Sequence, residues 1–246
     1  MKQWKQLWET ARQSVQFLLV AIVVIAAIVG VSYAAERWLA RKKKQKYMGL
    51  TIKKMAAVGM FAAVAAILML FEVALPFLPP FYKIDLSEVP VLICAFAFGP
   101  VAGVLAEVIK ILLNLLFDGT TTVFVGEFAN LTVGCSFIVP AAIVYQYRRT
   151  RAGAVFAVSL GTLLMTVFGS VFNAVYLLPA FSRLYGIPLE GLIAMGTKVN
   201  PAITDLTTFV FMAVVPLNLL KGVVVSLVVL FLYKPISRIL NQIVSA

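Results

Sequence analysis

Residues 101–117 read VAGVLAEVIKILLNLLF, an apolar run with three polar side chains. These are Glu107, Lys110 and Asn114, at spacings of three and four residues. Such spacings place side chains on one face of an α-helix, which turns once in about 3.6 residues. The run approaches the roughly 20 residues that cross a bilayer. It therefore predicts a membrane-spanning helix with one polar face.

The rest of the chain has a similar composition. Of its 246 residues, 62% are hydrophobic and 13% are charged, and the mean hydropathy is +1.01. A soluble domain is typically about 45–50% apolar and about 25% charged. A single water-soluble core cannot hide this much apolar surface, which excludes a soluble enzyme and a disordered chain. The apolar runs do not alternate as barrel strands do, so we expect an all-α polytopic membrane protein.

Seven apolar runs are candidates for membrane-spanning helices. They are residues 15–35, 56–75, 89–98, 101–117, 128–145, 155–178 and 209–233. The run at 89–98 is short for a span, so it is either tilted or extended by the polar segment before it. If it crosses, the three large basic clusters fall on one side of the membrane, as positive charge does in cytoplasmic loops. We therefore predict seven spans in the plasma membrane, with the N-terminus outside and the C-terminus in the cytoplasm.

The charges around the first run argue against a cleaved signal peptide, because the stronger basic cluster follows the run. We interpret the net charge of +11 as positive charge that sets the orientation of the chain in the membrane, so no nucleic-acid partner is expected. The chain contains no histidine and no P-loop motif, and Cys94 and Cys135 lie inside apolar runs as small hydrophobes. We expect no catalytic residue and no metal site.

Polar side chains at membrane depth are costly and need a reason. Several fall toward the predicted outer half: Asn114, Glu127, Asn130, Asn173, Asn218 and Lys221. Amides and one ammonium suit the hydroxyls and carbonyls of a water-soluble organic molecule, which predicts an outward-facing pocket. Structural alternatives remain open. Glu107 and Lys110 could pair with each other, Lys221 could snorkel to the headgroups, and Glu127 could stabilise a helix N-terminus.

Small residues recur along one predicted helix at Gly59, Ala62, Ala63 and Ala66. This spacing allows helices to approach closely in lipid. It fits packing within the chain or a surface for a partner membrane subunit, and periodicity does not separate the two.

Several segments between residues 50 and 238 resemble the substrate-binding S components of energy-coupling factor (ECF) vitamin transporters. They are LPPFYKIDLSEVP at 78–90, FGP at 98–100, Glu107-xx-Lys110, VGEFAN at 125–130, MTVFGSVFN at 165–173, LLP at 177–179 and Asn218-xx-Lys221-Gly222. The later segments look most like the riboflavin-specific member. The resemblance implies a six-helix core, here residues 48–246, that binds one vitamin near the outer face. Residues 1–47 would add a transmembrane helix and a basic cytoplasmic linker.

The resemblance also implies roles for individual residues. Asn173, Asn218 and Lys221 match ligand-contacting positions. We expect the other binding residues to be Glu127, Asn130, Asn114, Phe81 and Leu177, with Leu75, Phe77 and Val171 completing an apolar slot. The first loop would act as a lid, with Pro79, Tyr82, Lys83 and Asp85. The helix with Gly59, Ala62, Ala63 and Ala66 would face the coupling subunit.

The implied partners are riboflavin or a related flavin, a transmembrane coupling subunit, two ATPase subunits and membrane lipid. The chain has no P-loop of its own, which agrees with separate ATPase subunits. No cofactor is expected beyond the transported ligand. Three alternatives remain. One is the same fold with another ligand, such as a folate, thiamine or a queuosine precursor. Another is a membrane enzyme with Glu107 and Asp85 as an acid–base pair. The last is a scaffold that binds anionic lipid or a partner through residues 41–46.

Overall fold

The computed structural model describes residues 2–44, 47, 49–79, 81–120, 122 and 124–245, and within these ranges the side chains of residues 15–232 except Tyr185. The α-helices are α1 (Lys2–Lys42), α2 (Ile52–Met69), α3 (Glu88–Phe98), α4 (Pro100–Phe117), α5 (Val125–Tyr147), α6 (Arg151–Phe172), α7 (Leu178–Tyr185), α8 (Leu189–Val199), α9 (Leu206–Phe209) and α10 (Val215–Ser245). Two π-helical turns, η1 (Asn173–Leu177) and η2 (Val210–Val214), continue α6 and α9. Two short strands are β1 (Val73–Ala74) and β2 (Lys83–Ile84).

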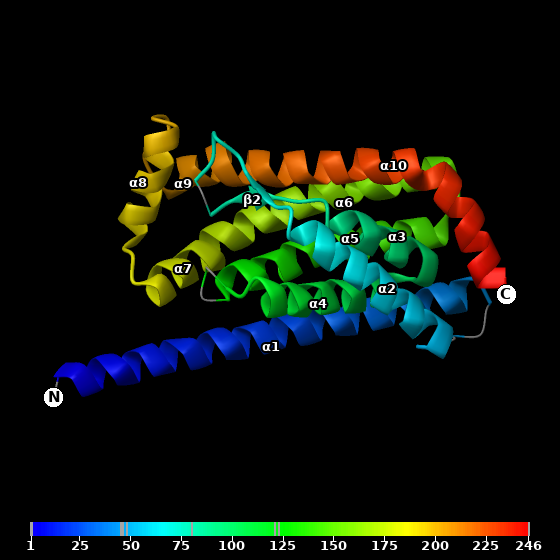
Figure 1. Cartoon of the computed structure of the whole chain (residues 1–246), viewed down its shortest axis with the longest axis horizontal. Coiled ribbons are helices and arrows are strands. Elements are labelled where there is room, and N and C mark those ends of the chain that lie inside the picture. The colour runs from blue at the N-terminus through cyan, green and yellow to red at the C-terminus, as the bar shows by residue number, and fades with distance from the viewer. Residues whose placement is uncertain are drawn as a thin grey trace.

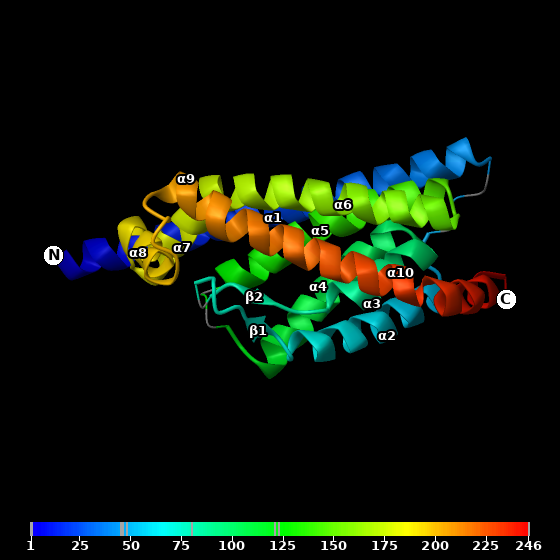
Figure 2. The same ribbon diagram turned by 90° about the horizontal axis from the view of Figure 1, so that it is seen from above.

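The fold is an all-α polytopic bundle, as predicted. Within the described residues, 6 helical stretches are long and apolar enough to cross a membrane. They are Val15–Lys42, Ile52–Met69, Pro100–Phe117, Val125–Tyr147, Arg151–Leu184 and Leu206–Leu232. The long helices follow the long axis of the molecule, while α8 stands across one end (Figures 1 and 2). The remaining predicted span, residues 89–98, corresponds to the short helix α3.

Helix α3 has 11 residues and is shorter than the six membrane-competent stretches, and strand β2 precedes it. Strands β1 and β2 pair antiparallel, with Val73 opposite Ile84 and Ala74 opposite Lys83. We refer to residues 73–87 as the lid segment.

Two predicted helix ends were wrong. Helix α2 ends at Met69 instead of continuing to residue 75, because the following residues pair as β1 with the returning chain. The helix predicted at residues 155–178, which begins with α6, does not end before Pro179. It continues through η1 into α7, and Pro179 lies directly after the π-helical turn, where the bonding pattern of the helix is already irregular. The segment between α7 and α9 contains α8.

The turn between α3 and α4 is fixed by Gly99 and Pro100. Gly99 has φ of 98°, in the left-handed region that glycine adopts without steric cost. Pro100 then begins α4, where a proline nitrogen is tolerated. The turn reverses the chain, so α3 and α4 pack side by side.

Small side chains bring α2, α3 and α4 close together. Ala62 and Ala65 of α2 pack with Ala95 of α3 and Ala106 of α4 in one buried cluster. Ala62 and Ala66 are 0% and 2% exposed, so their proposed place on a partner-facing surface is corrected. They lie on the face of α2 that the bundle buries.

The opposite face of α2 stays open. Gly59 and Ala63 are exposed and remain available to a partner. The small residues thus serve two faces of α2: Ala62 and Ala66 pack inside the bundle, while Gly59 and Ala63 stay uncovered.

Helix α1 packs along α4, α5 and α7, on the side of the bundle away from α10 (Figure 1). In the first half of α1, the ring of Phe17 lies 5.5 Å from that of Phe128 and 6.5 Å from that of Tyr176, centroid to centroid. Near its end, Glu36 Oε1 accepts a hydrogen bond of 3.0 Å from the Val101 amide and lies 3.3 Å from Lys54 Nζ. The carboxylate thus stabilises the N-terminus of α4.

Replacement of Glu36 with alanine is expected to weaken the attachment of α1. The change leaves the mostly buried Lys54 ammonium and the Val101 amide without their partner, at a cost of about 1–3 kcal/mol. A thermal unfolding assay in detergent should show a lower melting temperature for Glu36→Ala. Glu36→Gln, which keeps an acceptor for Val101, should show a smaller decrease. Equal melting temperatures for the native protein and Glu36→Ala would contradict this account.

Candidate functional site

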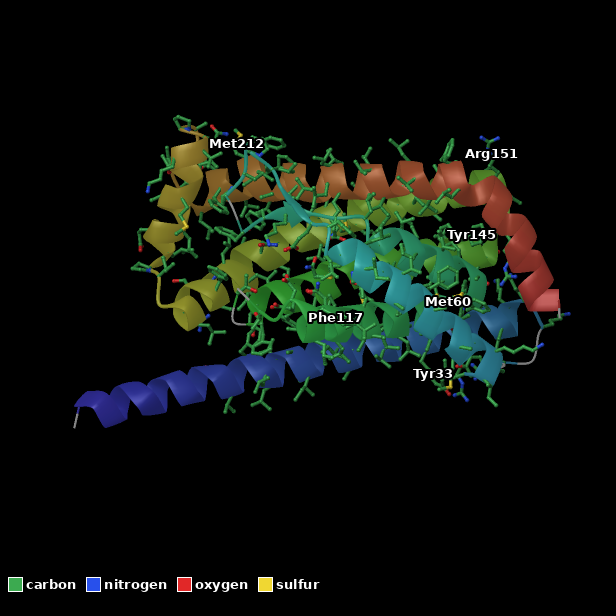
Figure 3. All side chains as sticks on the ribbon, in the orientation of Figure 1. Tyr33, Met60, Phe117, Tyr145, Arg151 and Met212 are labelled. Carbon is green, nitrogen blue, oxygen red and sulfur yellow. The ribbon has the colours of Figure 1, made fainter. Side chains whose placement is uncertain are left out.

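A cavity of about 440 Å³ lies between the lid segment and the ends of several helices. This volume is within the range of small-molecule sites, about 300–1,000 Å³. The walls come from the end of α2, the lid segment, η1 and the helices α3 to α8 and α10. Helices α7 and α8 mark this half of the molecule, and Arg151 lies at the opposite end (Figure 3).

The lid segment is fastened to the bundle by polar contacts at several points. The Tyr82 hydroxyl donates a hydrogen bond of 2.9 Å to Asn173 Oδ1 in η1. Lys83 forms an ion pair with Glu72, just after α2. Asp85 Oδ2 lies 3.0 Å from Lys221 Nζ in α10. The lid segment therefore joins three parts of the chain that are far apart in sequence.

Aromatic side chains of the lid segment also pack against α7 and α9. The ring of Phe81 lies 5.5 Å from that of Phe181 in α7 and 6.5 Å from that of Phe209 in α9. Tyr82 also packs on Phe209, with the ring centroids 6.1 Å apart. These flat apolar surfaces suit an aromatic ligand.

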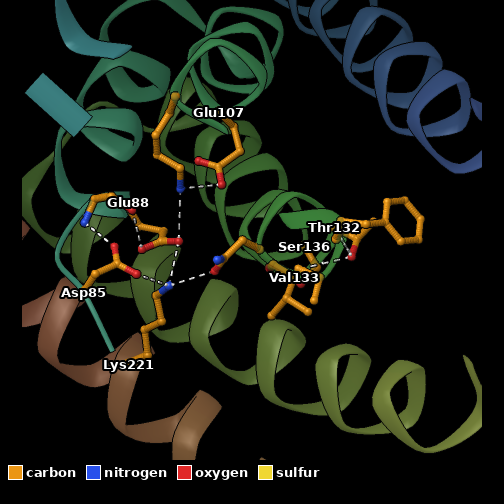
Figure 4. A network of polar contacts seen from close by, with 12 residues as sticks. Asp85, Glu88, Glu107, Thr132, Val133, Ser136 and Lys221 are labelled. Atoms are coloured by element: carbon orange, nitrogen blue, oxygen red, sulfur yellow. Dashed lines mark hydrogen bonds and ion pairs between the residues drawn. The ribbon is translucent and has the colours of Figure 1, made fainter. Parts of the chain in front are cut away.

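A network of buried charges joins the lid segment to α4 and α10 (Figure 4). Lys221 Nζ lies 2.9 Å from Glu88 Oε1, and it donates to Asn130 Oδ1 at 3.5 Å. Glu88 Oε1 also lies 3.3 Å from Lys110 Nζ, which is 2.6 Å from Glu107 Oε1. Charges at this depth are stable only when they are paired. The network therefore holds the lid segment and the polar faces of both helices in one arrangement.

The network decides two of the alternatives left open by the sequence. The pairing of Glu107 with Lys110 is confirmed, and Glu88 extends it. Neither Glu107 nor Lys110 lines the cavity. The snorkelling alternative for Lys221 is wrong, because its side chain is 11% exposed and lies against two carboxylates.

The structure brings the expected binding residues together. All eight line the cavity: Asn173, Asn218, Lys221, Glu127, Asn130, Asn114, Phe81 and Leu177. Of the expected lid residues, Tyr82, Lys83 and Asp85 also line it, while Pro79 is buried outside it.

The apolar slot was predicted only in part. Phe77 and Val171 are exposed on the outside of the bundle and do not reach the cavity. Leu75 packs against the cluster around Phe209. Methionines and other apolar side chains complete the walls instead, namely Met69, Met165, Met195, Leu217 and Phe181.

Asn218 brings an unpaired donor to this site. Its side chain lines the cavity, and its Nδ2 is buried without a hydrogen-bond partner among the described residues. An unpaired buried donor destabilises the protein by about 1–3 kcal/mol. An acceptor oxygen on a ligand would satisfy it.

Comparison with known proteins places the chain in a family. Residues 53–233 match the family model described as "ECF transporter, substrate-specific component". The chain is an S component of an ECF transporter. The matched residues contain the lid segment, the cavity and the charge network, while α1 lies before them.

Relatives of this S component include two bacterial proteins. The chain is 31% identical to "Riboflavin transporter RibU" of Staphylococcus aureus (strain TCH60), over 78% of this chain and 94% of that protein. It is 34% identical to "Riboflavin transporter FmnP" of Bacillus subtilis (strain 168), over 73% and 89%. A solved structure titled "Structure and mechanism of the S component of a bacterial ECF transporter" superposes with a TM-score of 0.61. That chain is 32% identical, and the match covers 76% of this S component and 97% of the solved chain.

Sequence reasoning about this S component gave Glu88 no role in the binding site. Its position in the segment Asp85-Leu86-Ser87-Glu88, directly before an apolar run, was the available signal. Its partners Lys110 and Lys221 come from α4 and α10, so their pairing is not visible in local spacing. Thr122 was also missed. It lines the cavity and donates a hydrogen bond of 3.0 Å to Glu127 Oε2.

Proposed function

We propose that this chain is the riboflavin-binding S component of an ECF transporter and mediates riboflavin uptake. The observation that carries the proposal is a cavity lined by Asn173, Asn218 and Lys221, in a chain whose relatives are named riboflavin transporters. The proposed activity is binding and delivery, without catalysis on the ligand.

The cavity has groups for each part of a flavin. Phe81 and Leu177 offer apolar surface to the flat isoalloxazine ring. The Asn218 amide donor suits a ring carbonyl oxygen. Amide and carboxylate groups of Asn114, Glu127 and Asn130 suit the ribityl hydroxyls.

Transport requires partners that supply energy. The sequence contains no P-loop, so we propose that two ATPase subunits and a transmembrane coupling subunit act with this chain. The exposed face of α2 around Gly59 and Ala63 is the proposed contact for the coupling subunit. The cavity lies at the end opposite Arg151, which supports an outward-facing site with the N-terminus outside and the C-terminus in the cytoplasm (Figure 3).

The proposal is tested by identifying what the protein binds. The protein is purified in detergent and its visible absorption spectrum is recorded. It is then denatured, and any released small molecule is identified by mass spectrometry. We expect a yellow protein that releases near-stoichiometric riboflavin. A colourless protein that also fails to quench the fluorescence of added riboflavin would overturn the proposal.

A further inference from the structure

Helix α1 lies before the part of the chain that matches the family model, which begins at residue 53. The bundle nevertheless holds α1 at two places that are far apart along its length. At one place Glu36 accepts a hydrogen bond from the Val101 amide at the start of α4. At the other, Phe17 packs against α5 and η1. The second contact brings α1 close to the cavity.

The Phe17 side chain is buried between aromatic rings. It is 8% exposed, whereas the next residue, Leu18, is 57% exposed. The Phe17 ring meets that of Phe128 in α5 edge to face, at an interplanar angle of 81°. It lies nearly parallel to the ring of Tyr176 in η1, at an angle of 9°. Both are favoured arrangements of aromatic pairs, so this contact fixes how α1, α5 and η1 sit together.

The same contact reaches the wall of the cavity. Phe17 packs in one buried cluster with Val125 and Phe128 of α5 and with Leu177 of η1. Val125 and Leu177 also line the cavity, whereas Phe17 does not. Phe17 therefore supports this wall from behind, one layer of side chains away from the ligand site.

The π-helical turn η1 is the part of the wall that depends most on such support. Asn173, its first residue, lines the cavity and accepts the hydrogen bond from Tyr82 of the lid segment. Tyr176 lies three residues further in the same turn and packs on the rings of Phe17 and Phe128. Because both residues belong to one short turn, a displacement of Tyr176 also displaces the Asn173 amide.

From these contacts we infer that α1 positions the binding site, and that Phe17 is the positioning residue that holds η1 and the start of α5 in their binding geometry. Phe17 acts through Tyr176 and Phe128 and has no contact with the ligand. The inference rests on the proposed function, because riboflavin is the ligand whose binding it affects. It gives α1, which lies outside the family match, a role in binding by this S component.

The first measurement needs no ligand. Hydrogen–deuterium exchange with mass spectrometry compares the ligand-free, full-length native protein with Phe17→Ala. We expect the backbone amides of residues 173–184 to exchange at least about fivefold faster in the variant, because η1 and α7 lose their packing against α1. The amides of residues 215–232 in α10, on the side of the bundle away from α1, should exchange at the native rate (Figure 1).

The second measurement is the dissociation constant of riboflavin, obtained by fluorescence titration. Phe17→Ala should raise it by at least about fivefold, because binding must then order a wall that the native protein holds in place. Phe17→Leu keeps a large apolar side chain at this position. It should recover most of the native affinity.

Two control variants separate positioning from other effects of a change in α1. Leu18→Ala makes a similar truncation at the adjacent, exposed residue, so it should change neither measurement. Glu36→Ala weakens the attachment of α1 far from the cavity. It should lower the melting temperature and leave the riboflavin dissociation constant of the folded protein within about twofold of the native value.

The outcomes distinguish this inference from the proposed function. Native exchange rates at residues 173–184 in Phe17→Ala overturn the inference. So does a native riboflavin affinity in Phe17→Ala, or an equal loss of affinity in Leu18→Ala or Glu36→Ala, since the effect would then not depend on the position of η1. If the native protein binds no riboflavin, the proposed function fails, and the exchange measurement alone decides whether Phe17 positions η1.

Discussion

Replacement of Lys110 with methionine is expected to destabilise the protein by about 3–5 kcal/mol. Lys110 is fully buried and lies between Glu107 and Glu88, at 2.6 Å and 3.3 Å. Methionine fills a similar volume but removes the positive charge, so the two carboxylates remain buried without this counter-ion. The melting temperature of purified Lys110→Met in detergent measures the loss.

A double variant distinguishes charge from packing. Glu107→Gln combined with Lys110→Met removes one charge of each sign and keeps both side-chain shapes. We expect the double variant to recover part of the stability lost in Lys110→Met, because it leaves fewer unpaired charges. A melting temperature for Lys110→Met equal to that of the native protein would contradict the network as a stabilising unit. So would additive losses in the double variant.

The second large effect is expected for flavin binding in Lys221→Met. Lys221 lines the cavity and holds both Asp85 of the lid segment and Glu88. Its loss removes a donor from the site and frees the lid segment from α10. Truncating one partner of a buried charge pair typically costs about 2–5 kcal/mol, so riboflavin affinity should fall by at least about 30-fold. Fluorescence titration measures the change.

Lys110→Met is also the control for this experiment. It belongs to the same network but does not line the cavity. In the fraction that folds, we expect Lys110→Met to keep most of its riboflavin affinity while Lys221→Met does not. Equal affinities in the two variants would mean that Lys221 acts only through the stability of the network, and its direct role would be rejected.

Local periodicity predicted most of the fold. Apolar runs close to the length of a bilayer became helices, and the polar face at Glu107, Lys110 and Asn114 is a face of α4. The ends of α2 and α7 were not predictable in this way. The end of α2 depends on pairing with the distant strand β2, and the helix passes Pro179 because η1 and α7 pack against neighbouring helices.

The site was predicted as a set of residue types rather than as a set of contacts. Asn and Lys in apolar runs indicated the cavity, because a polar group at membrane depth needs a reason. The pairing of Asp85 with Lys221 joins residues 136 apart in sequence, so only the fold reveals it. The same holds for the hydrogen bond from Tyr82 to Asn173, which joins residues 91 apart.

The π-helical turns η1 and η2 have a consequence for how this protein tolerates the insertion or deletion of single residues during evolution. Each contains five residues with π-helical bonds, which is one residue more than an α-helical turn accommodates. In an uninterrupted α-helix one added residue would rotate everything beyond it by about 100°, whereas the wider π-helical turn takes up the added residue and leaves the orientation of the following helix nearly unchanged. Asn173, which receives the Tyr82 hydrogen bond, stands at the start of η1. The loss of a single codon here would therefore convert η1 into an α-helical turn and change which side chains stand beside Tyr82, while α6 and α7 keep their orientation.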